Sequence, residues 1–528
     1  MRKPEKARNV RFIPSSSFII AILVLKSNIN IIMMNILLIY PQCPDSFWGF
    51  KHALKFISKK AAVPPLGLIT VSAMLPGTWQ KKLVDLNITN LQENDIKWAD
   101  YIFISAMYIQ KESVNRILAA CKKHHKKIVA GGPLFTQEYE NYPMIDHFIL
   151  NEAEITLPLF LKDLSDGHPQ NLYQTDEYAD ITLTPVPDFQ LLSSKDYVSM
   201  NIQVSRGCPF ACNFCEITSL LGHIVRMKNT AQIIDELDAL FHQVKWRGSV
   251  TIVDDNFIGN KNEVKKNLLP AMKEWMQLHH YPFSFNIETS VNLSDDEELM
   301  SLLVETGFNS TFIGIETPAE ESLKYCNKIQ NRNRDLLASI KKIQKAGLQV
   351  SGGFIVGFDS DTPAVFQRQV DFIQQSGIVS AMVGLLNAPK NTKLYQQLKA
   401  ENRLTTEATG NNTDSSMNFI PQMNYDDLLE GYKMIIHDIY STHPYYKRLR
   451  QLLLNYNRKG KRHAKINFSI LKGFLKSVFI IGFLNRGRSE YWKLIIWTIF
   501  RRPELIVDAV TYTVYGYHFR KVYGLSNK

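Results

Sequence analysis

The sequence predicts an α/β protein in three parts: an N-terminal doubly wound parallel sheet, an incomplete parallel barrel of six β/α units, and a basic, mostly helical C-terminal region. Two blocks in which short apolar runs alternate with helical periodicity predict the two sheets. The 528 residues, 45% hydrophobic and 21% charged, are ordinary for a globular chain of several domains. This composition excludes a disordered chain, a fibrous repeat and a disulfide scaffold.

Residues 1–33 are expected to be an extension outside the fold. Cations between Arg2 and Arg11 precede an apolar run at 18–25, which mimics the charged and apolar parts of a signal peptide. No small-residue cleavage site follows that run, and Met33 and Met34 directly precede a buried strand. We therefore expect translation to begin at one of these two methionines.

The first alternating block spans residues 34–163. Its expected strands are 36–40, 82–85, 101–105, 127–130 and 147–150, with helices over 66–75 and 112–124. Ligands of doubly wound sheets bind at the carboxyl ends of the strands. Ser105, Gly131, Gly132 and Pro133 lie at two of these ends, so we expect them to face a ligand.

The second alternating block spans residues 200–404 and is separated from the first by a Pro- and Gly-punctuated linker at 164–199. Its expected strands are 202–205, 249–253, 284–288, 311–316, 349–356 and 381–387, with helices such as 335–346 and 363–376. In parallel barrels the chemistry lies at the C-terminal ends of the strands.

The C-terminal region, residues 405–528, is expected to hold a helix over 425–440 and then a basic tail. Residues 442–528 carry 18 Lys and Arg against 3 Asp and Glu, a net charge of +15. Residues 1–33 carry +5, which leaves −9 for residues 34–441. This acidic body argues against a nucleic-acid-binding core, and the tail is the part suited to an anionic surface.

The tail contains apolar stretches at 468–484 and 491–500, interrupted by lysines and rich in Trp and Tyr. Such stretches are typical of amphipathic helices lying on a membrane surface. A helical cap whose apolar face packs on the body is the alternative. Because no 18-residue run is uninterruptedly apolar, we expect a cytoplasmic protein that contacts the inner face of the membrane peripherally.

Three cysteines, Cys208, Cys212 and Cys215, directly follow the first strand expected in the second block. An odd local trio favours metal ligation over disulfide pairing. Three thiolates can bind three irons of a [4Fe–4S] cluster and leave the fourth iron open for a substrate or cofactor. A structural zinc site is the alternative, but it needs four ligands, and Cys326 lies 111 residues further on.

This Cys-x3-Cys-x2-Cys segment, with Phe214 before its last cysteine, resembles the radical S-adenosylmethionine superfamily. The resemblance implies that the open iron binds the amino and carboxylate groups of S-adenosylmethionine, and that the reduced cluster cleaves this cofactor to a 5′-deoxyadenosyl radical. It also implies a set of cofactor contacts on the loop and later strand ends: Phe214, Asp254, Asp255, Glu316, Gly352 and Gly353.

The N-terminal block resembles the Rossmann-like cobalamin-binding module of cobalamin-dependent radical enzymes, on the stretches 64–68, 130–133 and 151–154. The resemblance implies that Ser105, Glu152 and the Gly131-Gly132-Pro133 turn contact cobalamin. The Asp-x-His-x-x-Gly segment that supplies a cobalt ligand in other cobalamin proteins is absent from the sequence. Cobalt would then carry no protein histidine, which favours methyl transfer.

Over residues 34–440 the likeness extends to the family of hopanoid C-2 methylase and its relatives, on the stretches 45–50, 64–68, 205–215, 254–260 and 354–359. It implies a cobalamin-dependent radical methyltransferase acting on an unactivated carbon of an apolar, lipid-like substrate. A reductase, flavodoxin or ferredoxin would supply electrons. The alternatives are another radical reaction, such as rearrangement or cyclisation, and a non-enzymatic cobalamin or cluster sensor.

Overall fold

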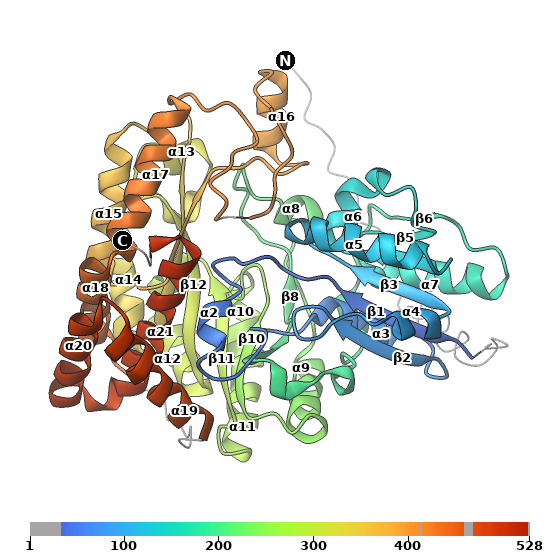
Figure 1. Cartoon of the computed structure of the whole chain (residues 1–528), viewed down its shortest axis with the longest axis horizontal. Coiled ribbons are helices and arrows are strands. Elements are labelled where there is room, and N and C mark those ends of the chain that lie inside the picture. The colour runs from blue at the N-terminus through green and yellow to red at the C-terminus, as the bar shows by residue number, and fades with distance from the viewer. Residues whose placement is uncertain (1–32, 412, 459–467, 526–528) are drawn as a thin grey trace.

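A computed structural model describes residues 33–411, 413–458 and 468–525 of the chain (Figure 1). The N-terminal domain is built on a six-stranded parallel sheet in the order β2-β1-β3-β4-β5-β6. Its strands are β1 (Asn35–Tyr40), β2 (Gln80–Asp85), β3 (Tyr101–Ser105), β4 (Lys127–Gly131), β5 (His147–Ile149) and β6 (Leu172–Tyr173). The five strands predicted here are confirmed to within two residues at either end.

Helices cover both faces of this sheet. The helices are α3 (Leu66–Met74), α4 (Glu93–Trp98), α5 (Lys111–Lys122), α6 (Pro133–Glu138) and α7 (Ala153–Ser165). Alternate residues of β1 point to opposite faces, so Ile36 and Leu38 pack with α3 and α7, whereas Leu37 and Ile39 pack with α4, α5 and α6. These two apolar layers make the domain doubly wound, as predicted.

The segment expected to be a linker contributes to the first domain. Residues 172–173 form β6, which adds a sixth strand beside β5. Further along, Tyr197 forms a bridge with Ala61, and its hydroxyl donates to Asp85 at 2.8 Å. The expected extension at 1–33 falls almost wholly on residues 1–32, which lie outside the described part of the chain.

The second domain is a half-barrel, a six-stranded parallel sheet in the order β14-β13-β12-β11-β10-β7. Its strands are β7 (Ser199–Ile202), β10 (Gly248–Ile252), β11 (Phe283–Thr289), β12 (Phe308–Glu316), β13 (Gln349–Val356) and β14 (Ala381–Leu385). Its outer helices include α9 (Thr230–Asp238), α11 (Leu269–Leu278), α12 (Glu297–Thr306), α14 (Leu336–Ala346) and α15 (Ala364–Ser376). The six predicted β/α units are therefore confirmed.

The first of these strands differs from its prediction at 202–205. Strand β7 ends at Ile202, and a separate hairpin pairs β8 (Ser205–Arg206) with β9 (Arg226–Met227) in antiparallel fashion. The strand ends early because of the side chain of Asp254, whose contacts hydrophobic periodicity cannot predict. The carboxylate of Asp254 accepts hydrogen bonds from the Val204 amide and the Ser205 hydroxyl, and this occupies the chain just where a longer strand would continue.

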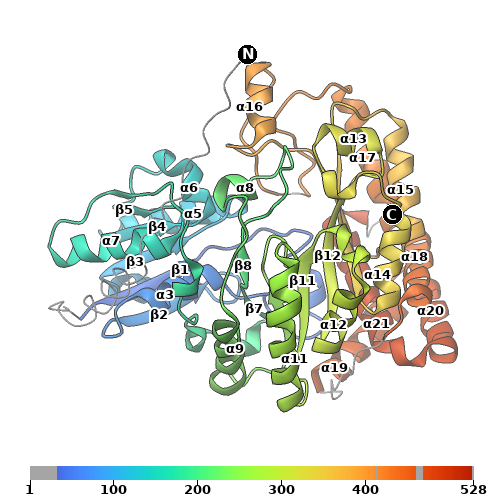
Figure 2. The same cartoon turned by 180° about the vertical axis from the view of Figure 1, so that it is seen from behind.

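The C-terminal region forms helices that pack on the half-barrel beside α14 and α15, as Figure 2 shows from behind. They are α17 (Tyr425–Tyr440), α18 (Thr442–Asn455), α19 (Phe468–Ser477), α20 (Arg488–Arg501) and α21 (Ile506–Val522). Phe519 on α21 stacks on Phe47 of the N-terminal segment, with ring centroids 4.2 Å apart and planes 7° apart. This part of the tail is a cap on the body. Every helix among the described residues is too short or too polar to span a bilayer.

Candidate cluster and cofactor site

The three cysteines lie on the loop after β8, at the C-terminal end of the half-barrel strands. Cys208, Cys212 and Cys215 are all half-buried and free of disulfides. All three lie within eight residues of one loop, and Cys212 is close enough to Cys208 and Cys215 that its charge raises their pKa values, after the larger effect of burial. Their sulfurs are not gathered within 4.8 Å of one another, whereas four thiolates on one zinc ion would lie about 4 Å apart. Three spread thiols on one loop fit a cluster better than a single ion.

Buried carboxylates at the end of β10 hold this loop. Asp254 accepts from the Val204 amide at 2.7 Å and from the Ser205 hydroxyl at 2.6 Å. Asp255 accepts from the Gly207 amide at 3.2 Å. Because both Asp254 oxygens are engaged within the chain, the structure gives this residue a positioning role, and its direct contact with S-adenosylmethionine stays a prediction.

The far side of the loop is held through backbone carbonyls. Asn213 donates its amide N–H to the Cys326 carbonyl at 3.0 Å, and Asn327 donates its side-chain amide to the Ala211 carbonyl at 2.9 Å. Gly207 has a φ of 93°, and a Cβ there would lie 2.7 Å from the Ile224 carbonyl oxygen. Glycine at this position lets the chain turn into the cysteine loop.

A buried ion pair lies beside the cysteines. Lys328 donates to Glu316 at 2.5 Å, and Glu316 adopts a left-handed φ of 62° at a register shift in β12. Burial alone would lower the pKa of Lys328, but the charges of Glu316 and Cys212 raise it. Sequence reasoning found Glu316 and missed Lys328, because the lysine lies outside any strand end and no local motif marks it.

Burial also shifts the pKa values of the acidic groups around the loop. It raises the pKa of Cys208, and that of Cys215 to about 12. Because thiolates are the iron ligands, cluster loading must displace these protons. Burial raises the pKa of Asp254 to about 6. Desolvation by the surrounding protein and the charges of Asp255 and Asp254 raise the pKa of Glu288 to about 7, although its side chain is exposed. Glu288 is a further candidate that sequence reasoning passed over, although it ends a predicted strand.

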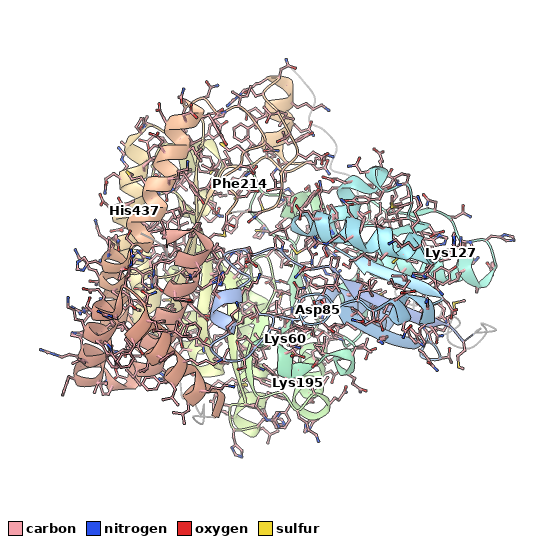
Figure 3. All side chains as sticks on the ribbon, in the orientation of Figure 1. Lys60, Asp85, Lys127, Lys195, Phe214 and His437 are labelled. Atoms are coloured by element: carbon pink, nitrogen blue, oxygen red, sulfur yellow. The ribbon has the colours of Figure 1, made fainter. Side chains whose placement is uncertain are left out.

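Three further residues are predicted to bind S-adenosylmethionine, namely Phe214, Gly352 and Gly353, and the structure gives them different surroundings. Phe214 lies against Phe358, just beyond β13, with ring centroids 6.1 Å apart (Figure 3 labels Phe214), and its contact with the cofactor stays a prediction. Gly353 faces inward, and a Cβ there would lie 2.8 Å from the Phe312 ring. Gly352 faces the opposite way, and a Cβ there would meet Ile378 on the outer side at 3.2 Å. Packing therefore accounts for Gly352.

The residues predicted to contact cobalamin gather at the carboxyl edge of the N-terminal sheet. A Cβ on Gly132, whose φ is 92°, would lie 2.8 Å from the Ser105 hydroxyl oxygen, and Pro133 begins α6. A Cβ on Gly131 would lie 2.6 Å from the Ile149 carbonyl oxygen. Close chain packing already requires both glycines, so their contact with a cofactor stays a prediction.

The structure shows a role for Glu152 in joining the two domains, and its contact with cobalamin stays a prediction. Its carboxylate accepts two hydrogen bonds from Arg226, both at 2.7 Å, and also binds the Ala179 amide. Next to it, Glu154 accepts two hydrogen bonds from Arg206, at 2.8 and 3.0 Å. Both arginines belong to the hairpin that carries the cysteine loop. Glu152 thus joins the N-terminal domain to that hairpin, through partners that lie more than fifty residues away in sequence.

The donor set fits a [4Fe–4S] cluster, since three half-buried thiols lie on one loop. His223, the nearest histidine in sequence, is exposed rather than directed into the trio. Among the other cysteines, Cys121 and Cys326 are buried, whereas Cys43 is half-buried.

Comparisons with known proteins agree with this geometry. The Radical SAM superfamily matches residues 202–373, and a Domain of unknown function (DUF4070) matches residues 392–527. An uncharacterized methyltransferase of Synechocystis sp. is 40% identical over 92% of this chain and 91% of its own length. Hopanoid C-2 methylase of Rhodopseudomonas palustris is 31% identical over 88% of this chain and 89% of its own length.

Among solved structures, the cobalamin-dependent S-adenosylmethionine radical enzyme OxsB, with aqua-cobalamin and S-adenosylmethionine bound, has a TM-score of 0.60 to this chain. It is 15% identical, and the match covers 94% of this chain and 84% of that one. At this identity the likeness concerns the fold alone.

A half-barrel with a cysteine trio after its first strand defines a radical S-adenosylmethionine enzyme. Within that superfamily, the chain belongs to the methyltransferase family that includes hopanoid C-2 methylase.

Replacing Cys208, Cys212 or Cys215 with Ala is expected to abolish iron loading and 5′-deoxyadenosine formation, because each removes one of three cluster ligands. Iron content and the reductive cleavage of S-adenosylmethionine are the measurements. Cys326→Ala is the matched control, since this cysteine is buried beside the loop without belonging to the trio. Full iron loading in any of the three variants would refute the ligand assignment.

Asp254→Ala is expected to weaken cluster retention, because it leaves the Val204 amide and the Ser205 hydroxyl without their acceptor, at a cost of about 1–3 kcal/mol for each group. Two measurements distinguish a positioning role of Asp254 from direct contact with S-adenosylmethionine. They are the iron content after gel filtration and the KM for S-adenosylmethionine. Loss of iron supports the positioning role. Unchanged iron with a raised KM would instead assign Asp254 to cofactor contact.

Proposed function

We propose that this protein is a cobalamin-dependent radical S-adenosylmethionine methyltransferase that methylates an unactivated carbon of an apolar, hopanoid-like lipid. The observation that carries the substrate class is the apolar inner face of the half-barrel next to the cysteine loop. Family membership supports the reaction type. The choice of a lipid rests on this inner face and on the surface of the C-terminal helices.

The inner face is polar near the strand starts and along β11, where Glu288 follows Asn286 on the same side, and it becomes apolar along β12 and β13. Near the strand starts, Asn286 bridges Ser249 and Ser310 by hydrogen bonds of 2.6 and 2.5 Å. Further along, Phe312 on β12 lies over Gly353, and Trp48 meets the Phe312 ring edge-on at 5.3 Å. This gradient places an apolar wall on the same side as the cysteine trio.

Trp48 closes this wall from the N-terminal domain. Its indole N–H donates to the Met382 sulfur on β14 at 3.0 Å, and its side chain remains 39% exposed. Ile355 on β13 extends the same inner face. A half-exposed tryptophan among apolar neighbours supports contact with an apolar substrate, since burying such a ring is strongly favourable.

The carboxyl edge of the N-terminal sheet supports a cobalamin site between the two domains. Gln137 on α6 donates to Glu216, at the start of the short helix α8 (Ile217–Leu220) that follows the cysteine loop, at 3.2 Å. Lys111 on α5 pairs with Glu407 from the segment after the half-barrel at 2.9 Å. Ligands of doubly wound sheets bind at this edge. A cofactor held there would face the inner side of the half-barrel.

The cluster with S-adenosylmethionine would supply the radical, and cobalamin would supply the methyl group. The chain's own residues hold and orient these groups. Asp254 fixes the cysteine loop, the Lys328–Glu316 pair sets the charge beside it, and the apolar wall excludes water from the reacting carbon. A reductase, flavodoxin or ferredoxin would deliver electrons to the cluster.

The C-terminal helices support docking on an anionic membrane. Leu471, Leu475, Phe479 and Phe483 recur every four residues along α19 and its π-helical continuation Val478–Leu484, and each is about half exposed or more. A π-helical turn is wider than an α-helical one, so this spacing keeps the side chains on one side. Exposed stripes of this kind mark interaction surfaces on soluble proteins.

The neighbouring helix adds to this surface. On α20, which packs against the π-helical segment, Ile499 is 51% and Phe500 81% exposed. Exposed cations, among them Lys472, Lys493 and Arg501, accompany the apolar residues. Apolar side chains flanked by cations complement an anionic lipid surface, which would also give access to a lipid substrate.

Anaerobic reconstitution with iron, sulfide and cobalamin, followed by incubation with a lipid extract, tests the reaction. We expect a product heavier by one methyl group and labelled from methyl-labelled S-adenosylmethionine. A labelled cofactor cleaved without mass gain in any lipid would favour rearrangement or cyclisation, and an uncleaved cofactor would favour a sensor. In the same assay, Trp48→Ala is expected to lower methylation about tenfold by loss of apolar substrate contact.

Trp48→Ala should leave 5′-deoxyadenosine formation intact, because the cysteine loop is untouched. Trp98→Ala, in the N-terminal domain on α4, is the matched control and should methylate normally. Equal methylation by wild type and the Trp48 variant would contradict the proposed substrate wall.

The double variant Phe479→Glu with Phe483→Glu is expected to weaken binding to anionic vesicles by about tenfold or more, since burying one Phe contributes about 1.5–3 kcal/mol. Co-sedimentation with phosphatidylglycerol vesicles measures it, with phosphatidylcholine vesicles as the uncharged comparison. Leu159→Glu, at an exposed leucine on α7, is the matched control. Unchanged sedimentation of the double variant would refute the docking surface.

A further inference from the structure

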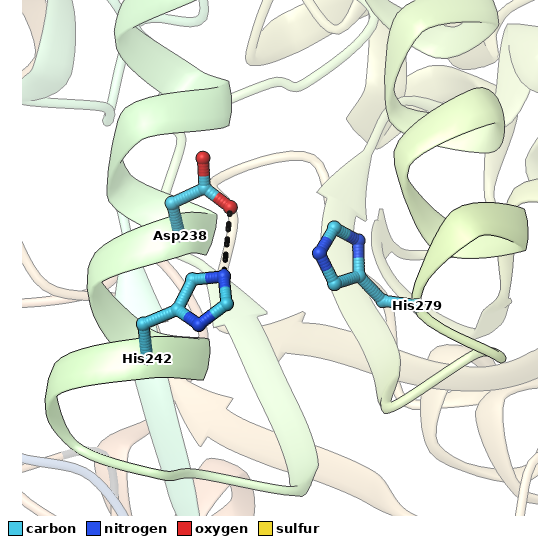
Figure 4. Close-up of side chains that lie close together, drawn as sticks. All are labelled: Asp238, His242 and His279. Carbon is cyan, nitrogen blue, oxygen red and sulfur yellow. Dashed lines mark ion pairs between the residues drawn. The ribbon is translucent and has the colours of Figure 1, made fainter.

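We propose that Asp238, His242 and His279 form a binding site for a divalent transition-metal ion of the zinc class. One ligand atom from each residue lies within 4.8 Å of the others, and Figure 4 shows the three side chains turned toward one another. The site is independent of the cofactor chemistry proposed above.

The three residues come from two neighbouring helices at the N-terminal edge of the half-barrel sheet. Asp238 ends α9, and His242 lies in the π-helical turn Ala239–Gln243 that leads toward β10. His279 caps the C-terminal end of α11, just before β11. The cysteine loop lies at the opposite edge of the same sheet, so this site is remote from the cluster (Figure 1).

A single tryptophan orients two of the three ligands. The backbone carbonyl of Trp275 lies 2.8 Å from Nδ1 of His279, and because a carbonyl only accepts, Nδ1 carries the proton in this contact. Nε2 of the neutral ring is then free to bind a metal. The indole N–H of Trp275 donates to Oδ1 of Asp238 at 2.9 Å. Metal-binding histidines and carboxylates are typically held by hydrogen bonds of this kind.

Stacking fixes the His279 ring further. It lies on the Trp275 ring at 4.2 Å with an interplanar angle of 24°, and Phe241 meets it edge-on at 4.6 Å. The second histidine is freer, since the His242 side chain is 63% exposed. One fixed imidazole and one adjustable imidazole allow the ligands to close on an ion.

The ligand atoms would have to move only a little to bind an ion. Nε2 of His242 lies 3.8 Å from Oδ1 of Asp238. Ligands at about 2.0–2.2 Å from a tetrahedral zinc ion lie about 3.4 Å from one another. Asp238 and His242 also line a surface pocket of about 410 Å³ together with Asp235, so ions can reach the carboxylate from solvent.

The donor set decides the class of ion. Two imidazole nitrogens and one carboxylate suit zinc, iron(II), cobalt or nickel, whereas calcium and magnesium prefer oxygen ligands throughout. Three protein ligands leave at least one position for water. A bound ion would link the end of α9 to the end of α11 and stabilise the edge of the half-barrel.

The test uses the full-length, cluster-loaded protein, in which iron occupies the cysteine trio. After equilibrium dialysis against buffered Zn²⁺, elemental analysis should find one zinc per chain, and zinc should raise the thermal unfolding midpoint. His242→Gln and His279→Gln should weaken zinc binding at least tenfold and lose the midpoint shift. Trp275→Phe, which keeps the ring but removes the indole N–H, should weaken it about 10- to 100-fold.

His437→Gln is the matched control, because Nδ1 of His437 lies 3.0 Å from Asp438 on the exposed side of α17, and no third ligand joins them among the described residues (Figure 3). It should bind zinc as the wild type does. The proposal is overturned by wild-type protein that retains no zinc. Equal zinc in wild type, His242→Gln and His279→Gln would overturn it as well. Iron content and S-adenosylmethionine cleavage, measured in each variant, verify that the fold and the cluster are intact.

Discussion

The carboxylate of Asp254 anchors the cysteine loop, and the geometry of the whole site depends on it. Its two oxygens bind the chain just beyond the end of β7, at Val204 and Ser205. Burial in this position opposes the charged form and raises the pKa of the carboxyl to about 6. A buried carboxylate is tolerated where hydrogen-bond donors satisfy it. Here those donors belong to the segment that must present the three thiols.

Two arginine–glutamate pairs join the hairpin that carries this loop to the N-terminal domain. Arg206 and Arg226, on the two strands of the hairpin, bind Glu154 and Glu152 of the N-terminal domain by paired hydrogen bonds. Two-pronged contacts of this kind fix orientation as well as distance. The domain that offers its sheet edge to a cofactor is thereby held in register with the loop that offers the thiols. A movement of either domain would therefore displace both the cysteine loop and the carboxyl edge of the N-terminal sheet.

The C-terminal helices pack on the body with one side and leave apolar side chains exposed on the other. Inward, Phe519 stacks on Phe47, and Nε2 of the buried His518 lies 3.1 Å from the Phe47 carbonyl, which holds the segment that carries Trp48 over the inner face of the half-barrel. Outward, α19 and α20 leave apolar side chains uncovered. The same region therefore supports the segment that carries Trp48 through α21 and carries the proposed membrane surface on α19 and α20.

The sequence by itself determined the local features. Alternating apolar runs predicted both parallel sheets, and the spacing of Cys208, Cys212 and Cys215 predicted the cluster ligands, because these signals lie within a few residues of one another. Contacts between distant segments were decided only by the tertiary structure. It brought Lys328 to the cysteines, paired Glu152 with Arg226, and gathered Asp238, His242 and His279. Side-chain partners separated by tens of residues leave no periodic trace in the sequence, and only the packing of the strands and helices sets their distances.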